Sequence, residues 1–396
     1  MIKVSEAKKI ISENAKKTGR KIKMNLKDSH GSVLAENIIS KTDLPPFDQS
    51  NVDGYAVSAS ENGEWLIKGE IIAGDFPGYL LQKNEAVRIF TGAALPENTH
   101  AVLMQENVIA KGNRLFYTRG DILKGSFIRK KGTQIKKGDT ALRAGTVINP
   151  AVMGFIASMG FNSVKVYVKP VVSLIITGNE IQQPGKKLGK GKVYDSNSIL
   201  LSSLLENSGY CADKIIFVKD KKNELMKAVG KQLECSDVIL ISGGVSVGKY
   251  DFVNEVLDEL KVKRLFYKVS QRPGKPLYFG RKAGVFVFGL PGNPASVFTC
   301  YYIYVMNLLN RISGIEKNFP ATGKIPVLRE IEKNFSLSWF LRGKLTEKGV
   351  MPLDGQASFM LRTLTEADCF IFMPAGKKKI RKNEPAEVYF FGNKKF

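Results

Sequence analysis

The stretch VILISGGVSVGKYD, residues 238–251, decides the fold that the rest of the chain is expected to adopt. Its apolar run ends at Ser242, a glycine turn begins at Gly243, and a helical pattern starts after Asp251. A strand, a glycine turn and a helix in this order present backbone N–H groups and a helix N-terminus to an anion. The turn matches neither GxGxxG nor GxxxxGK[ST]. On these residues alone, a tight turn that binds nothing is therefore an equally good interpretation.

Four other strings of glycine and polar residues stand where expected strands end. They are TGNE at 177–180, YDSN at 194–197, RPGKP at 272–276 and GLPGNP at 289–294. In this part of the chain, apolar runs of strand length alternate with helical patterns. Strands are expected over 171–177, 214–218, 238–242, 265–269 and 285–290, and helices over 196–207, 223–233, 251–260 and 295–309. The alternation predicts a doubly wound, mainly parallel sheet whose ligand binds beyond the carboxyl ends of its strands.

The 396-residue chain is 43% hydrophobic, which is enough to bury the cores of more than one domain. It has no apolar run of about 18 residues and no signal-peptide core at its N-terminus. We therefore expect a cytoplasmic protein without a membrane segment. The four cysteines lie far apart, and two histidines offer little material for a zinc site or a serine–histidine triad.

Sixty Lys and Arg residues against 37 Asp and Glu residues give a formal net charge of +23. Such an excess is typical of nucleic-acid-binding proteins. Here it is mostly lysine and is spread over loops at 129–137, 186–192 and 377–383, without a recognition helix, zinc finger or RNA-binding aromatic signature. An anionic small substrate explains the charge at least as well. We expect no nucleic-acid partner, and a basic nucleic-acid binder is kept as the alternative from another functional class.

Changes of pattern along the chain predict a multidomain architecture, α/β plus β. Short β-like runs broken by glycine and proline predict β-rich domains at 46–133 and 315–396, and the alternating region predicts an α/β domain at 170–314. The segments 1–45 and 134–169 flank the first β-rich region, and neither is large enough alone, so we expect them to form one extended domain. Helices are also expected at 4–17, 150–160 and 357–364.

Three carboxylates, Glu180, Asp220 and Asp251, follow three of the expected strands and should gather at one edge of the sheet. Close together, they repel one another and any phosphate unless they stay hydrated or hold a divalent cation such as Mg²⁺. A hard cation held between carboxylates and phosphate activates a phosphoanhydride for attack. The alternative for each residue alone is pairing with a helix N-terminus, worth about 0.3–1 kcal/mol, and Asp251 fits that interpretation well.

Two further groups of residues are candidates for the same chemistry. Lys268, Arg272 and Lys275 follow the fourth expected strand, and their cationic groups suit phosphate. Asp53 lies in a Pro/Gly-bounded loop, and Thr91 follows an expected strand. For these last two, a structured loop and a hydroxyl that caps a turn are the simpler interpretations.

Several long strings resemble one family, the molybdopterin molybdenumtransferases, which include the E domain of gephyrin. The strings occur in the order of the family, and the resemblance covers the whole chain. They are PPFDQSNVDGYAV, RIFTGAALPENTHAVLMQE, TGNEI, VYDSN, DVILISGGVSVGKYDFV, RPGKPLYFG and GLPGNPASV. The resemblance implies a homodimer of four-domain subunits, with an extended helical domain, an inserted β-rich domain, a molybdopterin-binding α/β domain and a C-terminal β-barrel.

The resemblance also implies an activity: insertion of molybdate into adenylylated molybdopterin with Mg²⁺, releasing AMP and giving molybdenum cofactor. A molybdopterin adenylyltransferase would be the partner that supplies the substrate. The implied site lies between the α/β domain of one subunit and the inserted domain of the other. Asp53 and Thr91 would come from the inserted domain, and Glu180, Asp220 and Asp251 would be the catalytic and metal-binding acids.

The residues that the resemblance assigns to substrate binding lie in two strings and at two isolated positions, Lys268 and Arg342. The glycine turn would hold the pterin phosphate or the nucleotide end, and the cations would hold the oxyanion or phosphate. Arg342 of LRGKL would face the same cleft, although a solvated strand charge is its alternative interpretation. The set is Ser242, Gly243, Gly244, Ser246, Gly248, Lys268, Arg272, Lys275 and Arg342.

Two positions depart from the family pattern. Asn179 stands in TGNE where the family usually has Asp, and Arg362 stands in GQASFMLRTL where a serine is common. Glu180 is kept, so the departure at Asn179 concerns a supporting role. A tungstate-preferring insertase and a non-catalytic molybdopterin-binding or scaffolding protein of the same fold remain open as alternative functions.

Overall fold

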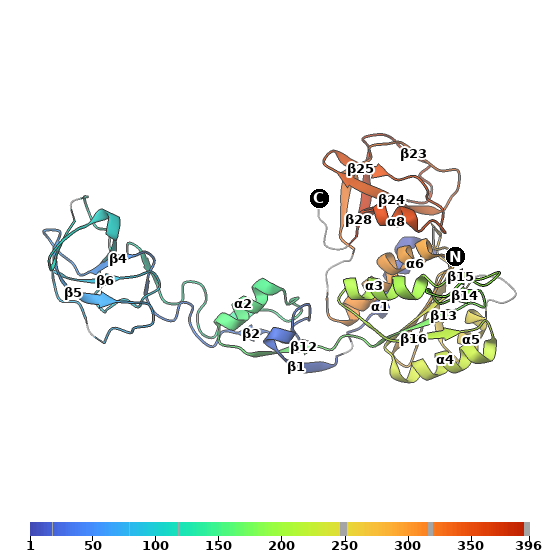
Figure 1. The fold of residues 1–396 in the computed structure, drawn as a ribbon, viewed down its shortest axis with the longest axis horizontal. Coiled ribbons are helices and arrows are strands. Elements are labelled where there is room, and N and C mark those ends of the chain that lie inside the picture. Colours follow the sequence, from blue (N-terminus) through green and yellow to red (C-terminus); the bar gives the residue numbers. More distant parts are fainter. Residues whose placement is uncertain (18, 79, 118, 246–251, 316–319, 392–396) are drawn as a thin grey trace. The chain divides into compact units, whose positions relative to one another are not determined.

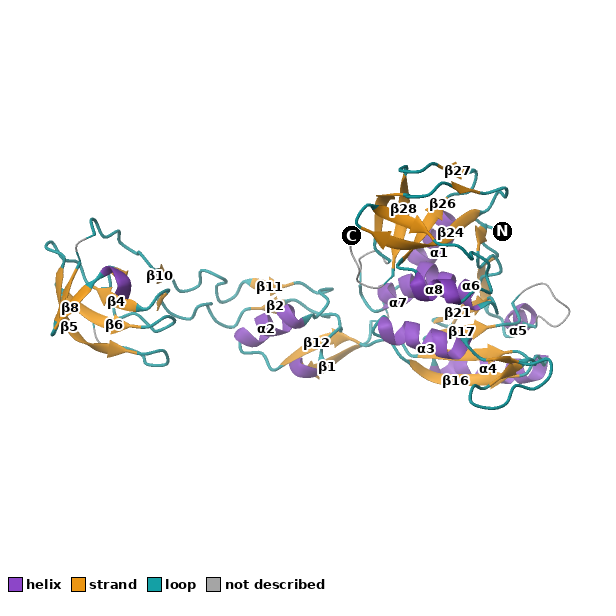
Figure 2. Cartoon of the chain, turned by 45° about the horizontal axis from the view of Figure 1, so that its top comes forward, coloured by secondary structure: helices purple, strands orange, loops and turns teal. Residues whose placement is uncertain are grey.

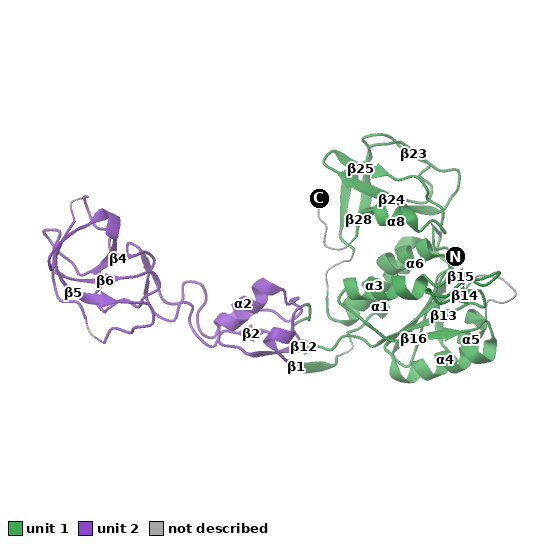
Figure 3. Cartoon of the chain, in the orientation of Figure 1, with its two compact units in different colours: residues 1–22, 31–33, 166–396 green, residues 23–30, 34–165 purple. Residues whose placement is uncertain are grey.

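The computed structural model describes residues 1–396 apart from 18, 79, 118, 246–251, 316–319 and 392–396. The chain divides into two compact units, coloured separately in Figure 3. Unit 1 comprises residues 1–22, 31–33 and 166–396, and unit 2 comprises residues 23–30 and 34–165. The first 22 residues, which the sequence pattern grouped with 134–169, thus belong to unit 1. The domain boundaries inside the two units stay predictions.

A six-stranded sheet forms the centre of unit 1, as the alternating pattern predicted (Figure 1). Its order is β16-β13-β17-β21-β20-β18, and the first four strands are parallel. The bounds are β13 (Val172–Thr177), β16 (Ala212–Val218), β17 (Val238–Ser242), β18 (Lys263–Tyr267), β20 (Tyr278–Lys282) and β21 (Val285–Leu290). The antiparallel strand β20 was not predicted, because its second half reads Gly-Arg-Lys and shows no apolar alternation.

Successive side chains of the central strands point to opposite faces and feed two separate cores. Leu174 and Leu240 belong to the core on the face covered by α3, whereas Ile175 and Ile241 belong to the core beneath α4 and α5. Figure 1 shows α3 and α4 on opposite sides of the sheet, and Figure 2 distinguishes the helices from the strands by colour. Because both faces are covered, the strands are apolar throughout, as parallel strands buried on both faces usually are.

The helices follow the predicted order with shifted ends. They are α1 (Val4–Asn14), α2 (Pro150–Ser158), α3 (Asn197–Asn207), α4 (Lys222–Cys235), α5 (Val253–Glu259), α6 (Pro294–Cys300), α7 (Met306–Ile312) and α8 (Arg362–Glu366). A π-helical turn at Tyr301–Val305 joins α6 to α7. The helix expected at 357–364 instead begins at Arg362, since the residues before it form a loop. None of the helices in the described ranges is both long and apolar enough to span a bilayer.

Helix α1 packs into unit 1 rather than beside the segments that follow it in sequence. Val4, Ala7 and Ile11 are buried in the core that contains α7. Next to Ala7 on the same helix, Lys8 Nζ donates a hydrogen bond of 2.8 Å to the hydroxyl of Tyr389 and lies 4.2 Å from the centre of the Tyr389 ring. This apolar stripe and the Lys8 contact are the physical reason why residues 1–22 group with unit 1.

The C-terminal strands form a curled sheet of order β19-β24-β26-β28-β22, with β25 paired to β24. The edges meet where Val327 bridges Val350, which closes a small barrel. One strand, β19, comes from the RPGKP region and pairs in parallel with β24. The bounds are β19 (Gln271–Arg272), β22 (Thr322–Pro326), β24 (Ser338–Thr346), β25 (Gly349–Pro352), β26 (Cys369–Met373) and β28 (Pro385–Phe390), with the ladder β23 (Ile331–Glu332) and β27 (Lys379–Ile380).

Unit 2 contains the β-rich region expected from the glycine- and proline-broken runs. Its six-stranded sheet has the order β7-β4-β6-β5-β9-β8 around a small core that includes Trp65 and Leu103. The strands are β4 (Gly54–Val57), β5 (Glu64–Ile71), β6 (Glu85–Ile89), β7 (Ala101–Met104), β8 (Ile109–Lys111) and β9 (Arg114–Phe116). Short ladders are formed by β2 (Ile38–Ile39), β3 (Gln49–Ser50), β10 (Ile128–Arg129) and β11 (Thr140–Leu142), and by β1 (Lys21–Asn25) and β12 (Ser163–Tyr167), which each also include two residues of unit 1. The predicted combination of α/β and β-rich parts is confirmed.

The half-buried Lys8 generates a prediction about stability. Burial lowers the pKa of Lys8 from 10.5 to about 8. Between pH 8 and pH 10.5 the unfolded chain keeps the Lys8 proton that the folded chain has released, so the free energy of unfolding rises with pH. Lys8→Met removes this cost of burying a charged ammonium group. We expect the variant to be more stable at pH 7, on the order of 1–3 kcal/mol, with the difference shrinking towards pH 10.

Urea unfolding of both proteins at several pH values between 7 and 10 measures this difference. Lys9→Met is the matched control, because Lys9 is the exposed neighbour on the same helix and, among the described residues, forms one ion pair, with Glu13 at 3.8 Å. A stability difference for Lys8→Met that stays constant over this pH range would contradict the assignment.

Candidate functional site

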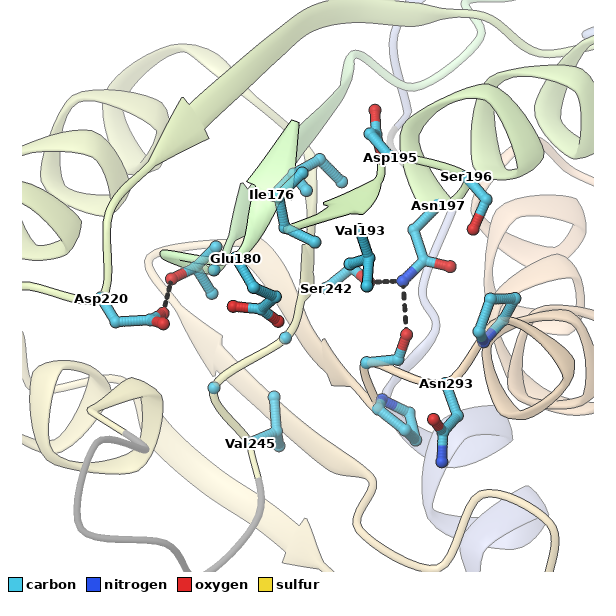
Figure 4. Close-up of a pocket in the computed structure, with 18 of the residues that line it drawn as sticks. Ile176, Glu180, Val193, Asp195, Ser196, Asn197, Asp220, Ser242, Val245 and Asn293 are labelled. Atoms are coloured by element: carbon cyan, nitrogen blue, oxygen red, sulfur yellow. Dashed lines mark hydrogen bonds between the residues drawn. The ribbon is translucent and has the colours of Figure 1, made fainter. Parts of the chain in front are cut away.

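A cavity of about 580 Å³ lies at the carboxyl ends of β13, β17 and β21. The chain runs from β13 to its neighbour β16 on one side and then to β17 on the other, so the strand order reverses here. Ligands bind at such a reversal in open α/β sheets. Residues of the TGNE, YDSN, SGG and GLPGNP strings all line the cavity, as predicted (Figure 4). The RPGKP string contributes only Pro276.

Asp220 is held in a fixed orientation at the cavity wall. Its Oδ1 accepts a hydrogen bond of 2.5 Å from the Thr177 hydroxyl, and its Oδ2 accepts one of 3.0 Å from the Asn179 backbone N–H. Asn179 Oδ1 in turn accepts from the Asp220 backbone N–H at 3.2 Å. An Asp at position 179 would supply the same acceptor oxygen, so the departure from the family pattern preserves this bond. The role of Thr177 was not predicted, although TGNE contained the signal.

Glu180 lines the same cavity and is exposed to it. Within the described ranges, no hydrogen-bond donor or cation pairs with its carboxylate. The third predicted acid, Asp251, lies outside the described residues, as do Ser246 and Gly248. Among the residues that are described, no three acidic, histidine or cysteine side chains gather closely enough to hold a metal ion. Among the described residues, the carboxylates that line the cavity are those of Asp195, Asp220 and Glu180.

The glycine turn after β17 can be built only from glycine at its first position. Gly243 has φ +98°, and a Cβ there would lie 2.2 Å from the carbonyl oxygen of Thr177. Its N–H donates to the Leu290 carbonyl at 3.2 Å, so the turn is tied to the end of β21 as well. Gly244, at φ +63°, follows in the same left-handed region and lines the cavity. The turn thus joins three strand ends around one space.

Asn197 connects the strings on the opposite side of the cavity. Its Nδ2 donates 2.7 Å to the Gly292 carbonyl and 3.0 Å to the Ser242 hydroxyl (Figure 4). The preceding Asp195 accepts from the Ser198 N–H at 3.1 Å and from the Ser198 hydroxyl, which caps the start of α3. These roles were not assigned from the sequence. The YDSN string marked the place, but a buried side-chain bridge leaves no pattern of its own.

The three predicted cations are not among the residues that line the cavity. The Lys268 ammonium lies 4.9 Å from the ring centre of Tyr267, and the Arg272 guanidinium lies 5.0 Å from that of Phe335. Arg272 belongs to β19, which joins the C-terminal sheet. The Lys275 carbonyl accepts hydrogen bonds from the backbone around the RPGKP loop.

Arg342 is buried, with 2% of its surface exposed, and its donors are taken by the loop that precedes α8. They reach the Ala357 carbonyl at 3.1 Å, the Met360 carbonyl at 2.7 Å and the Gln356 side chain at 3.2 Å. Burial lowers its pKa to about 10. The same loop touches the cavity rim, since Asn293 Nδ2 donates to the Ser358 hydroxyl at 3.0 Å. This geometry does not support the prediction of a cation that faces the cleft.

In unit 2, Asp53 and Thr91 lie together as a pair. One carboxylate oxygen of Asp53 accepts from the Thr91 N–H at 2.7 Å and from its hydroxyl at 2.8 Å. These donors lower the pKa of Asp53, because they stabilise its ionised carboxylate. The residue after Asp53 has to be glycine, because a Cβ on Gly54 would lie 1.9 Å from the Leu103 carbonyl oxygen. The sequence named both members of the pair without predicting their contact.

Three family models match consecutive parts of the chain. Residues 2–160 match the MoeA N-terminal region (domain I and II), residues 173–311 a probable molybdopterin binding domain, and residues 324–391 the MoeA C-terminal region (domain IV). Among solved structures, a molybdopterin biosynthesis MoeA protein from Pyrococcus horikoshii OT3 superimposes with a TM-score of 0.87 and 26% identity, covering 99% of this chain and 100% of that one.

Curated relatives extend the match to sequence. A molybdopterin molybdenumtransferase from Staphylococcus epidermidis is 31% identical over 98% of this chain and 95% of its own length. One from Staphylococcus aureus is also 31% identical, over 93% of this chain and 90% of its own length. The chain belongs to the molybdopterin molybdenumtransferase family.

Proposed function

We propose that this chain inserts molybdate into adenylylated molybdopterin, releasing AMP and giving molybdenum cofactor. The observation that carries the proposal is the cavity in which an oriented carboxylate, Asp220, and an exposed one, Glu180, lie beside the glycine turn. Membership of the family supports the reaction class, an enzyme of molybdenum cofactor biosynthesis.

Two helix N-termini at the cavity favour the anionic groups of the substrate. The N-termini of α3 and α6 open onto it through Asn197 and Pro294, and helix N-termini favour negative charge. We assign Ser242, Gly243 and Gly244 to the phosphate end of the substrate, with Ser246 and Gly248 following. Lys268, Arg272 and Lys275 remain proposed contacts of the oxyanion or phosphate from outside the cavity lining. For Arg342 the contacts support a structural role instead, because it holds the loop at the rim.

The donor set fits Mg²⁺, which prefers oxygen ligands from one or two carboxylates together with substrate phosphate. Asp220 and Glu180 would hold the ion, with Asp251 as the third acid. When bound, it would neutralise charge on the phosphoanhydride. Thr177 keeps Asp220 aligned through its hydroxyl, and the glycine turn brings backbone close to the phosphate. Asp53 and Thr91 would act in the same reaction from the second subunit of a homodimer, and a molybdopterin adenylyltransferase would supply the substrate.

Replacing the exposed carboxylate of Glu180 should abolish the chemistry without harming the fold. Glu180→Gln keeps the shape of an exposed side chain but removes its charge, so we expect molybdate-dependent AMP release to fall at least about 100-fold. The measurement follows AMP after purified protein is mixed with adenylylated molybdopterin, Mg²⁺ and molybdate. Glu206→Gln, which changes an exposed carboxylate on α3 outside the cavity, should retain full activity.

Normal activity in Glu180→Gln would remove this carboxylate from the mechanism. If the wild-type protein binds the substrate but releases no AMP with molybdate, the test is repeated with tungstate. Release with tungstate alone would identify a tungstate-preferring insertase, and release with neither would leave a binding or scaffolding protein.

Sharing of the site between subunits predicts complementation. Asp53→Ala and Glu180→Gln should each be inactive alone, but a mixed dimer would contain one site with both native residues. When the two variants are co-expressed in equal amounts, about half of the dimers are mixed, so about one quarter of the wild-type activity should return. Two different affinity tags isolate the mixed dimer. An isolated mixed dimer without activity would show that both residues are needed from the same subunit.

A further inference from the structure

A second cavity, of about 450 Å³, lies at the opposite end of the α/β sheet from the cavity described above. Asp237 and Val285 line it where β17 and β21 begin, whereas the other ends of these two strands reach the first cavity. Its volume is within the range of small-molecule sites. All of its lining residues belong to unit 1. The charged ones are four cations, Lys16, Lys17, Arg20 and Arg281, and two carboxylates, Glu234 and Asp237.

One cation and one carboxylate of this cavity are already engaged with each other. The Arg20 guanidinium donates to Asp237 Oδ2, which also accepts from the Val171 N–H at 2.8 Å. The Asp237 N–H in turn donates to the Val171 carbonyl at 2.9 Å. Arg20 and Asp237 therefore help to hold the chain that enters β13 beside the start of β17. Lys16, Lys17 and Arg281 are left against the single carboxylate of Glu234.

Arg281 is the distinctive side chain of the second cavity. It is half-buried on β20, opposite Phe286 of β21, and its guanidinium carbon lies 5.2 Å from the centre of the Phe286 ring. Among the described residues, none accepts a hydrogen bond from this guanidinium or forms an ion pair with it. A guanidinium meets an aromatic ring by its face, and the N–H groups at its edge match two oxygens of a phosphate or carboxylate. Arg281 thus brings a ready fork of donors to the cavity.

The two lysines follow helix α1. Lys16 is exposed, and within the described ranges its ammonium group has no hydrogen bond or ion pair. Lys17 Nζ lies 5.7 Å from the centre of the Tyr167 ring. The competing role for such cations is to complement helix C-termini, and α1, α4 and α7 all end near this cavity. That role requires neither a cavity nor a fork of donors.

We propose that the second cavity binds a small phosphate-bearing anion, with Arg281 holding two phosphate oxygens and the ammonium groups of Lys16 and Lys17 balancing the charge. Several cations gathered around one space suit phosphate better than a single carboxylate, because a phosphate monoester carries about two negative charges at neutral pH. This site lies outside the proposed function, since the full lengths of β17 and β21 separate it from the first cavity.

Inorganic pyrophosphate is the probe, and the reactivity of Lys16 is the local readout. The full-length protein is treated with a neutral acetylating reagent at several pyrophosphate concentrations, with ionic strength held constant by sodium chloride, and acetylation is followed by mass spectrometry. We expect pyrophosphate to slow acetylation of Lys16 saturably, which gives a dissociation constant. Lys9, which is exposed on α1 and lies outside the cavity, should react at an unchanged rate.

Arg281→Gln should raise this dissociation constant about 10- to 100-fold, because it removes charge-assisted hydrogen bonds. Arg264→Gln is the matched control and should leave the constant unchanged. Arg264 lies on the neighbouring strand β18, is exposed and does not line the cavity. Equal weakening in both variants would show that only the overall charge matters and would overturn the proposal. Protection of Lys16 by sodium chloride alone would do the same.

Molybdate-dependent AMP release without added pyrophosphate shows that Arg281→Gln is folded. It should match that of the wild-type protein, because Arg281 does not reach the first cavity. If this variant does not fold, Lys16→Gln is compared with Lys9→Gln, with Lys17 acetylation as the readout. Unchanged protection in Arg281→Gln or in Lys16→Gln would leave these cations with the helix C-termini and refute the anion site, without bearing on the proposed function.

Discussion

The close approach of Gly243 to the Thr177 carbonyl is the constraint on which the site depends. A Cβ at this position would lie 2.2 Å from that oxygen, so only glycine allows the ends of β17 and β13 to meet. The approach brings the TGNE turn and the glycine turn to one cavity. Thr177 then places its hydroxyl on Asp220, which orients the acid. One missing side chain thus determines where three functional segments lie.

Charge is distributed in two opposing ways. The chain carries a net charge of +23, yet the described part of the larger cavity presents carboxylates and two helix N-termini rather than lysines. A general excess of positive charge attracts an anionic substrate over a distance. Inside the cavity, carboxylates would repel a phosphate that arrives without a cation. In the proposed function, attraction of the substrate and its selection within the cavity therefore fall to different residues.

Much of the α/β part could be predicted from sequence, because apolar runs and glycine turns are local signals. Ser242, Glu180 and Asp220 were placed at one sheet edge by strand order alone, and all three line the cavity. Long-range packing had no such signal. Burial of Arg342 depends on a side-chain oxygen and two backbone carbonyls that lie 14 to 18 residues away in sequence, and the Asn197 bridge depends on Gly292. Such contacts are fixed only once the sheet has formed.

The pairing of β19 with β24 has a consequence for synthesis on the ribosome. Domains tend to fold as they emerge, N-terminal parts first. Here Gln271 and Arg272 emerge with the α/β sheet, but their partner strand, β24, is made much later. Helix α1 likewise waits for α7 before its apolar stripe is covered. Until then the nascent chain exposes an unpaired strand edge and an apolar helix face, which are features that chaperones bind. Completion of unit 1 is thus delayed until translation reaches the C-terminal sheet.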